Sequence, residues 1–471
     1  MKRTQTSPPT NLVAILAAAA LVILILQPQP TWLPLVENYN TLAGSTDMAT
    51  VAPALLDDYA RQPWSAYRAA NAGYAALALG QPADALIYFN RAADLRGWDT
   101  DLRRAVGDAY AALGNIEQAL AAWETAWQEG LRTPSVLNRL AVAYETQGDY
   151  DRAVAVLDTL LADQPDNAVG HYRRGLLLLN SNPREAKTSL LTAARLSSEL
   201  APLVDVMVQT IDASQTSEDR ALQLAGLGFG LVNIGEYGLA TTLLEQSIAL
   251  NPNLAAAHAY LGLAVSRQGG DGLPYFEDAV ALAPESPLAH SLLGVYWREQ
   301  GDLDQALGAL QTAVNLDPIN PALNTELGDV YLALGDLPNA EVWYSNAARL
   351  EPQNVTYATL LAEFYLTNDY LIETGYEWAA RAVQLGPNNA AANDIYGYSL
   401  WLQSRDAEAQ AVLNYALTLD PERAATYYHL GLVLAELGQY ADARNSYERA
   451  IALAPEGAVG NLAINALARL P

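Results

Sequence analysis

Between residues 66 and 457 the apolar and small side chains return to the same positions about every 34 residues. The unit at 424–457 shows the pattern most clearly, and the units that begin at 287, 321 and 390 repeat it. In 424–457 these positions hold Tyr427, Leu430, Gly431, Leu434, Gly438, Tyr440, Ala443, Tyr447, Ala450 and Pro455. The spacing predicts a first and a second helix in each unit, with a glycine in the turn between them.

Each recurring position has a physical reason. A small residue at the eighth position, such as Gly107 or Gly228, lets the first helix pack closely against its neighbours, and a large side chain there would cost about 1–3 kcal/mol by overpacking. An aromatic residue or leucine from the second helix, such as Trp123, fills the remaining gap. Gly114 relieves the turn, and Pro165 stops the second helix because proline lacks a backbone N–H.

Counting by these positions gives eleven units. They are 66–99, 100–133, 134–167, 168–200, 221–254, 255–286, 287–320, 321–354, 355–389, 390–423 and 424–457. The unit 255–286 is two residues short around its Gly-Gly-Asp-Gly sequence, and the unit 355–389 carries one extra residue near its turn. Residues 51–63 fit the second helix of a broken repeat, and 458–470 fit a terminal helix that covers the last exposed face.

Residues 201–220 belong to no unit. The stretch 201–208 is typical of an extra helix, and 214–219 of a polar turn. We expect this interruption to act as a hinge between an N-terminal arm at 51–200 and a C-terminal arm at 221–457, with a capping helix at 458–471. The alternative is a degenerate twelfth repeat in a continuous array.

The pattern resembles the tetratricopeptide repeat, a helix–turn–helix unit of 34 residues, because several positions recur together many times. The resemblance implies an all-α, right-handed superhelical solenoid of about eleven units. It also implies that partners bind on a concave face lined by the first helix of each unit.

An unbroken apolar run lies at 12–26, after Lys2 and Arg3. Its fifteen residues span about 22 Å as a helix, less than the roughly 30 Å of a bilayer core, so it is either a signal-peptide core or a short anchor. We favour an anchor at 11–27, followed by a linker at 28–50, because no small-residue cleavage site follows closely. No Lys or Arg lies between Arg3 and Arg61, which predicts that 1–10 stays cytoplasmic and the repeats are exported. Cleavage would make the protein secreted.

Composition narrows the chemistry. The 471 residues include 26 basic and 52 acidic side chains, and the net charge of −26 disfavours nucleic-acid binding. The chain has no cysteine, which excludes disulfides, thiolate metal sites and a cysteine nucleophile. Its four histidines lie at most one per repeat, which favours packing over metal binding. We therefore expect no enzymatic activity, no cofactor and no metal.

In the N-terminal arm, the positions that line the groove in this family include three arginines, one asparagine and one tyrosine. These residues are Arg104, Asn138, Arg139, Tyr172 and Arg173. The functional interpretation is a small patch for a carboxylate or an acidic peptide, since arginine pairs with carboxylates bidentately. The alternative is that the arginines form local salt bridges with acids such as Asp108 and Glu145.

The groove positions of the C-terminal arm are acidic and aromatic. They hold Glu326, Asp329, Glu363 and Asp394, together with Tyr398, Trp401 and Tyr428. The aromatic side chains would anchor a peptide or stack on a sugar ring, or else serve only for packing between repeats.

The main hypothesis is a non-enzymatic, membrane-anchored and exported scaffold that binds a protein or peptide on its concave surface. The second hypothesis is a carbohydrate-binding accessory of polysaccharide synthesis or export, because exported repeats of this family occur in such machinery. A glycosyltransferase is disfavoured, since the repeats leave no room for a catalytic domain.

Overall fold

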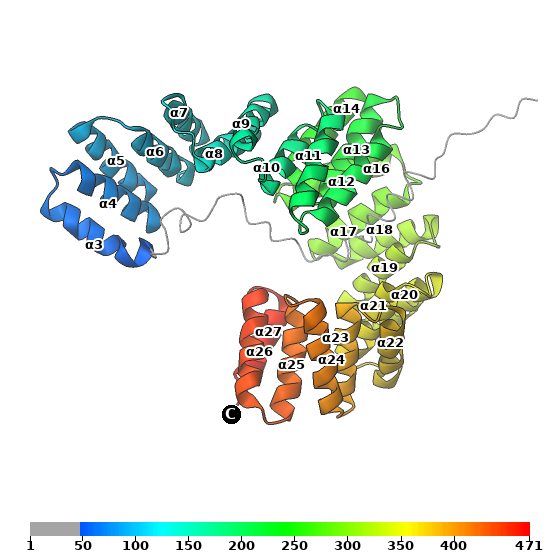
Figure 1. Cartoon of the computed structure of the whole chain (residues 1–471). Helices are drawn as coiled ribbons and strands as arrows, with labels where there is room; N and C mark the ends of the chain where they lie inside the picture. The colour runs from blue at the N-terminus through cyan, green and yellow to red at the C-terminus, as the bar shows by residue number, and fades with distance from the viewer. Residues whose placement is uncertain (1–47) are drawn as a thin grey trace, which may run out of the picture. The chain divides into compact units, whose positions relative to one another are not determined.

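The computed structural model describes residues 48–471, and the regular elements of this part of the chain are the helices α3 to α27 (Figure 1). These residues divide into two compact units, 48–268 and 269–471. The predicted cytoplasmic segment 1–10, the anchor at 11–27 and most of the linker lie outside the described residues. Among the helices of 48–471, none combines the length and the apolar character that a membrane crossing requires.

The unit 48–268 contains thirteen helices. They are α3 (Met48–Arg61), α4 (Ala66–Ala78), α5 (Pro82–Arg96), α6 (Thr100–Ala112), α7 (Ile116–Gln128), α8 (Pro134–Thr146), α9 (Tyr150–Asp163), α10 (Ala168–Leu177), α11 (Pro183–Leu196), α12 (Ala201–Ser214), α13 (Arg220–Asn233), α14 (Tyr237–Leu250) and α15 (Ala255–Arg267).

The unit 269–471 contains twelve helices. They are α16 (Leu273–Leu282), α17 (Pro287–Glu299), α18 (Leu303–Leu316), α19 (Pro321–Ala333), α20 (Leu337–Leu350), α21 (Val355–Thr367), α22 (Ile372–Leu385), α23 (Ala390–Leu402), α24 (Asp406–Leu419), α25 (Ala424–Glu436), α26 (Tyr440–Leu453) and α27 (Ala458–Leu467). The all-α repeat fold is therefore confirmed.

At the eighth position of a unit the first helix lies directly against a large side chain of the second helix. A Cβ atom built on Gly107 would lie 2.4 Å from Trp123 Nε1, and one on Gly294 would lie 2.6 Å from Leu310 Cγ. The large side chain from the second helix thus occupies the volume that a side chain at the eighth position would need. Turn glycines have the expected left-handed backbone, as Gly301 does with φ +80°.

The irregular units show how the repeat tolerates extra residues. In the unit 355–389 the additional residue is accommodated by left-handed backbone at Asp369 (φ 52°) and Leu371 (φ 50°), just before α22. In the unit 390–423 Ser404 adopts φ 58° at the turn where most units have glycine. Non-glycine residues in this region are strained, so the packing of the surrounding helices must hold them there.

Helix α12 occupies the interruption predicted at 201–220. It packs against both α11 and α13, and Val204, Met207 and Ile211 are fully buried. The boundary between the two compact units lies between Gln268 and Gly269. This boundary falls inside the shortened repeat 255–286. The role of 201–220 as a hinge between two arms stays a prediction.

Candidate functional site

The first helices of successive pairs contact one another. In the compact unit 48–268, for example, α4 contacts α6, and in the compact unit 269–471 α21 contacts α23. We call the surface that these first helices share, described separately in each unit, the first-helix face. The sequence-predicted groove residues all lie on first helices. The charges and aromatic rings on this face therefore decide what it can bind.

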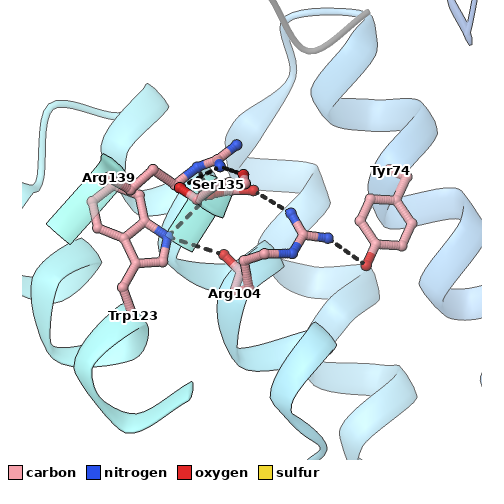
Figure 2. A network of polar contacts seen from close by, with 6 residues as sticks. Tyr74, Arg104, Trp123, Ser135 and Arg139 are labelled. Atoms are coloured by element: carbon pink, nitrogen blue, oxygen red, sulfur yellow. Dashed lines mark hydrogen bonds and ion pairs between the residues drawn. The ribbon is translucent and has the colours of Figure 1, made fainter. Parts of the chain in front are cut away.

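Asp108 is buried on the first-helix face of 48–268 and pairs with Arg104 and Arg139. Figure 2 labels these two arginines together with Tyr74, Trp123 and Ser135. The Oδ1 atom of Asp108 pairs with Arg139 Nε at 2.7 Å and accepts a hydrogen bond from Trp123 Nε1 at 3.0 Å. Its Oδ2 pairs with Arg104 Nη1 at 2.7 Å. Burial raises the pKa of the Asp108 carboxyl, although both arginines act in the opposite direction.

The two arginines that pair with Asp108 also have other partners (Figure 2). Arg104 donates to Tyr74 Oη at 3.3 Å, and its guanidinium lies 5.9 Å from the centre of that ring. Arg139 donates to the backbone oxygen of Ser135 at 3.1 Å and also to its hydroxyl. Since each guanidinium is already paired and only partly accessible, this geometry favours the structural alternative over an anion-binding patch.

Arg173 is also paired, and here one arginine lies between two carboxylates. It contacts Glu145 on the preceding first helix, α8, and donates to Glu236, just before α14, at 2.8 and 3.0 Å. Burial raises the pKa of Glu145, while Arg173 lowers it. Asn138 is partly accessible and Tyr172 is buried. Binding at the five predicted residues of this arm stays a prediction.

Two charge networks lie on the first-helix face of 269–471. In the first, Arg298 pairs with Glu326 and Asp329, each at 2.9 Å, and Asp329 accepts a hydrogen bond from Tyr344. Burial raises the pKa of Asp329, and Arg298 opposes this.

The second network surrounds Asp394, which is 2% exposed. Arg423 Nε lies 3.2 Å from its Oδ2, and His429 Nδ1 lies 2.8 Å from its Oδ1. Burial alone would raise the pKa of Asp394, but His429 and Arg423 together hold it below its ordinary value. The carboxylate therefore stays ionised and ties α23 to α25.

The aromatic side chains predicted for the groove form a row beside this network. The ring of Tyr398 stacks with Trp401 at 5.5 Å and with His429 at 4.3 Å between centroids, and Tyr428 lies 5.5 Å from His429. Tyr398, Trp401 and Tyr428 are partly accessible. They thus contribute to packing between α23 and α25 and still present aromatic surface to solvent.

A pocket of about 310 Å³ lies beyond the end of this row. It is lined by residues of α25, α26 and α27 and of the segment after α27, namely Tyr428, Leu432, Ala435, Tyr447, Leu462, Asn465, Ala466, Arg469 and Leu470. Because Tyr428 belongs to both the row and the pocket, the two features form one continuous surface.

The histidines have structural partners. His171, His258 and His290 each place Nε2 2.9–3.0 Å from a proline carbonyl six residues earlier. His429 pairs with Asp394. Within 48–471 no group of three or more His, Cys, Asp or Glu residues is arranged to hold a metal ion.

Sequence reasoning identified Asp108 and Glu145 as possible partners of the arginines, and it missed Glu236, Arg423 and the Asp394–His429 pair. Glu236 lies 63 residues from Arg173, so no local spacing indicates their contact. The Asp394–His429 pair spans 35 residues, close to one repeat, and this periodic spacing was the available signal.

Models of the tetratricopeptide repeat match residues 104–168, 138–199, 266–321, 298–364 and 424–456. No curated protein matches the chain in sequence. Among solved structures, yeast Tom70 is 17% identical with a TM-score of 0.42, covering 88% of this chain and 96% of that chain. Cut9, in the Cut9–Hcn1 hetero-tetramer structure, is 17% identical with a TM-score of 0.44, covering 97% and 98%.

A third solved structure is YrrB, described as a TPR protein with an unusual peptide-binding site. It is 21% identical with a TM-score of 0.31, and the match covers 41% of this chain and 96% of that chain. The family models and the recurring helix pairs agree in kind and in position. The chain is a tetratricopeptide-repeat protein.

Proposed function

We propose that this protein is a non-enzymatic scaffold that binds a segment of a partner protein on the first-helix face of 269–471. The observation that supports this most is the row of Tyr398, Trp401 and Tyr428, which is partly accessible and leads into the pocket beside α27. Aromatic residues next to a pocket are typical anchors of protein interfaces, because they bury much apolar area at little cost in conformational entropy.

The N-terminal arm is the weaker candidate for this binding. Arg104, Arg139 and Arg173 already satisfy carboxylates of the chain itself, so an incoming anion would have to compete with Asp108, Glu145 and Glu236. We therefore place the main binding surface on α23, α25 and α27.

Purification of the full chain from its cells, with variants compared side by side, tests this function. Trp401→Ala should lose a specifically retained partner that the parent retains. Tyr415→Ala, which removes an exposed aromatic side chain of the second helix α24, should keep it. Equal retention by both variants would show that the aromatic row is not the binding surface.

The second candidate, a carbohydrate-handling accessory, rests on the same aromatic rings, since sugars stack on exposed aromatic faces. A glycan array with the parent and Trp401→Ala separates the two candidates. Glycan binding that is lost in Trp401→Ala would favour carbohydrate recognition over a protein partner.

We also propose that the protein is anchored in a membrane by 11–27, with 1–10 in the cytoplasm and the repeats outside it. Support comes from the apolar run 12–26, from Lys2 and Arg3 before it and from the absence of basic residues up to Arg61. Alkaline extraction of membranes and protease accessibility of the repeats test this arrangement. Release by alkali would contradict the anchor, and protection of the repeats after every outer barrier has been opened would contradict the orientation.

A further inference from the structure

Glu363 differs from Glu326, Asp329 and Asp394, the other three carboxylates at the predicted groove positions of 269–471. Glu326 and Asp329 pair with Arg298 on one side of it, and Asp394 pairs with Arg423 and His429 on the other. Glu363 on α21 is exposed, and its side chain makes no hydrogen bond or ion pair within the described residues. This carboxylate is therefore available to a group from outside the chain.

Charges from several helices act on Glu363. The surrounding protein partly desolvates the carboxyl of Glu363, and this desolvation raises its pKa. The negative charges of Asp394 and Asp329 raise the pKa further, whereas Arg423 and His429 lower it. These four groups belong to α23, α19, the loop before α25 and α25 itself. Glu363 thus lies among converging helices although water reaches it. A cation placed there would pair with it in surroundings that screen the attraction less than open solvent does.

The net charge of the unit also favours a cation. Residues 269–471 contain 26 Asp and Glu residues and 8 arginines, a net charge of −18, while residues 1–268 carry −8. No lysine occurs in 269–471. A field of one sign attracts partners of the opposite sign and increases their rate of association.

The neighbouring first helix supplies surface for the stem of a basic side chain. Tyr398 occupies on α23 the same position in the repeat, the ninth, that Glu363 occupies on α21. Its ring stacks with Trp401. The methylene stems of lysine and arginine pack against apolar surface, and the partly accessible rings of Tyr398 and Trp401 offer such a surface.

We propose that the first-helix face over α21, α23 and α25 binds a partner segment through a lysine or arginine side chain, whose cation pairs with Glu363 and whose stem lies against Tyr398 and Trp401. The proposal rests on the proposed function and specifies its partner as basic. This charge is opposite to that of the acidic partner expected from the arginines of the N-terminal arm.

Peptide pools test the proposal on the full chain in detergent. Each pool contains twelve-residue peptides with random sequence around one fixed central residue, which is lysine, arginine, norleucine or glutamate. The parent should retain the lysine and arginine pools roughly tenfold better than the norleucine and glutamate pools. Glu363→Gln, an isosteric change at an exposed position, should remove this preference.

Glu377→Gln is the matched control, because Glu377 is an exposed carboxylate on α22, the second helix of the same pair. It should keep the preference of the parent. An unchanged preference in Glu363→Gln, or equal retention of all pools by the parent, would overturn the proposal.

Trp401→Ala distinguishes this failure from failure of the proposed function. If Trp401→Ala loses all pools while Glu363→Gln behaves like the parent, the binding face stands and its basic specificity is wrong. If both variants retain every pool as the parent does, the binding face itself is wrong.

Discussion

The fourth position of a repeat holds a polar side chain that bonds to the preceding proline in six units. His171, His258, His290, Asn324, Asn393 and Tyr427 each reach the carbonyl of a proline six residues earlier, at 2.9–3.5 Å. Because a carbonyl only accepts, each of these side chains donates. The bond fixes the loop that enters the repeat, so histidine at this position has a structural role.

The eighth position is where a single methyl group decides stability. In Gly294→Ala the new Cβ would lie 2.6 Å from Leu310 Cγ, so we expect a loss of about 1–3 kcal/mol in the free energy of unfolding. Gly308→Ala in the partner helix α18 meets no atom within 4 Å and should gain about 0.4–1 kcal/mol. Urea unfolding followed by circular dichroism measures both changes. A loss in both variants, or in neither, would contradict the packing at this position.

The contribution of Asp394 to the free energy of unfolding should depend on pH. Its pKa is lower in the folded protein than the ordinary value of 3.8, so its ionised form stabilises the fold above that pH, and the contribution disappears as the pH falls through the folded value. Asp394→Asn should lower the free energy of unfolding by about 1.5–3 kcal/mol at pH 7. The difference from the parent should shrink below about pH 4. Urea titrations at several pH values check this, and a difference independent of pH would contradict it.

At the scale of helices, charged pairs fix how neighbouring repeats meet. The sixth position of one first helix faces the twelfth position of the preceding one in the pairs Arg173–Glu145 and Glu326–Arg298, with the charges exchanged between the two cases. The same two positions of neighbouring repeats are therefore joined by an ion pair in both cases, although the acid and the base have changed places. Groove positions inferred from the family gave these residues their place on the face, whereas their pairing follows from the stacking of the helices.

Among the charged side chains of the N-terminal arm, we expect removal of Arg173 to lower the free energy of unfolding most. In Arg173→Met, Glu145 and Glu236 would lose their shared cation, at an expected cost of about 3–5 kcal/mol. Hydrogen exchange should accelerate in α8, α10 and α14 and stay unchanged in 269–471. Arg152→Gln, whose ion pairs lie at the surface, should have little effect. Equal exchange in the parent and in Arg173→Met would show that this bridge does not hold the helices.

For the whole molecule, most of the architecture was predictable because apolar positions recur in every unit. The extra helix at 201–220 was predicted from its apolar start, and its true end at Ser214 was not, because helix ends depend on local packing. The Gly-Gly-Asp-Gly sequence marked the place where the compact units divide, although the sequence alone indicated only a shortened repeat. The charged groove residues were found, and Asp108 and Glu145 were expected as partners of the arginines. The burial of these residues and the pairs made by Glu236, Arg423 and His429 required the fold.

Photo-crosslinking in cells tests most directly the central claim, that a partner binds the first-helix face of 269–471. Benzoylphenylalanine is introduced at Trp401 on α23 or, as the control, at Tyr415 on α24, and crosslinked proteins are identified by mass spectrometry. The account predicts that one partner crosslinks from position 401 and not from position 415, and that Glu363→Gln weakens this crosslink. A partner captured only from position 415, or equally from both positions, would contradict it.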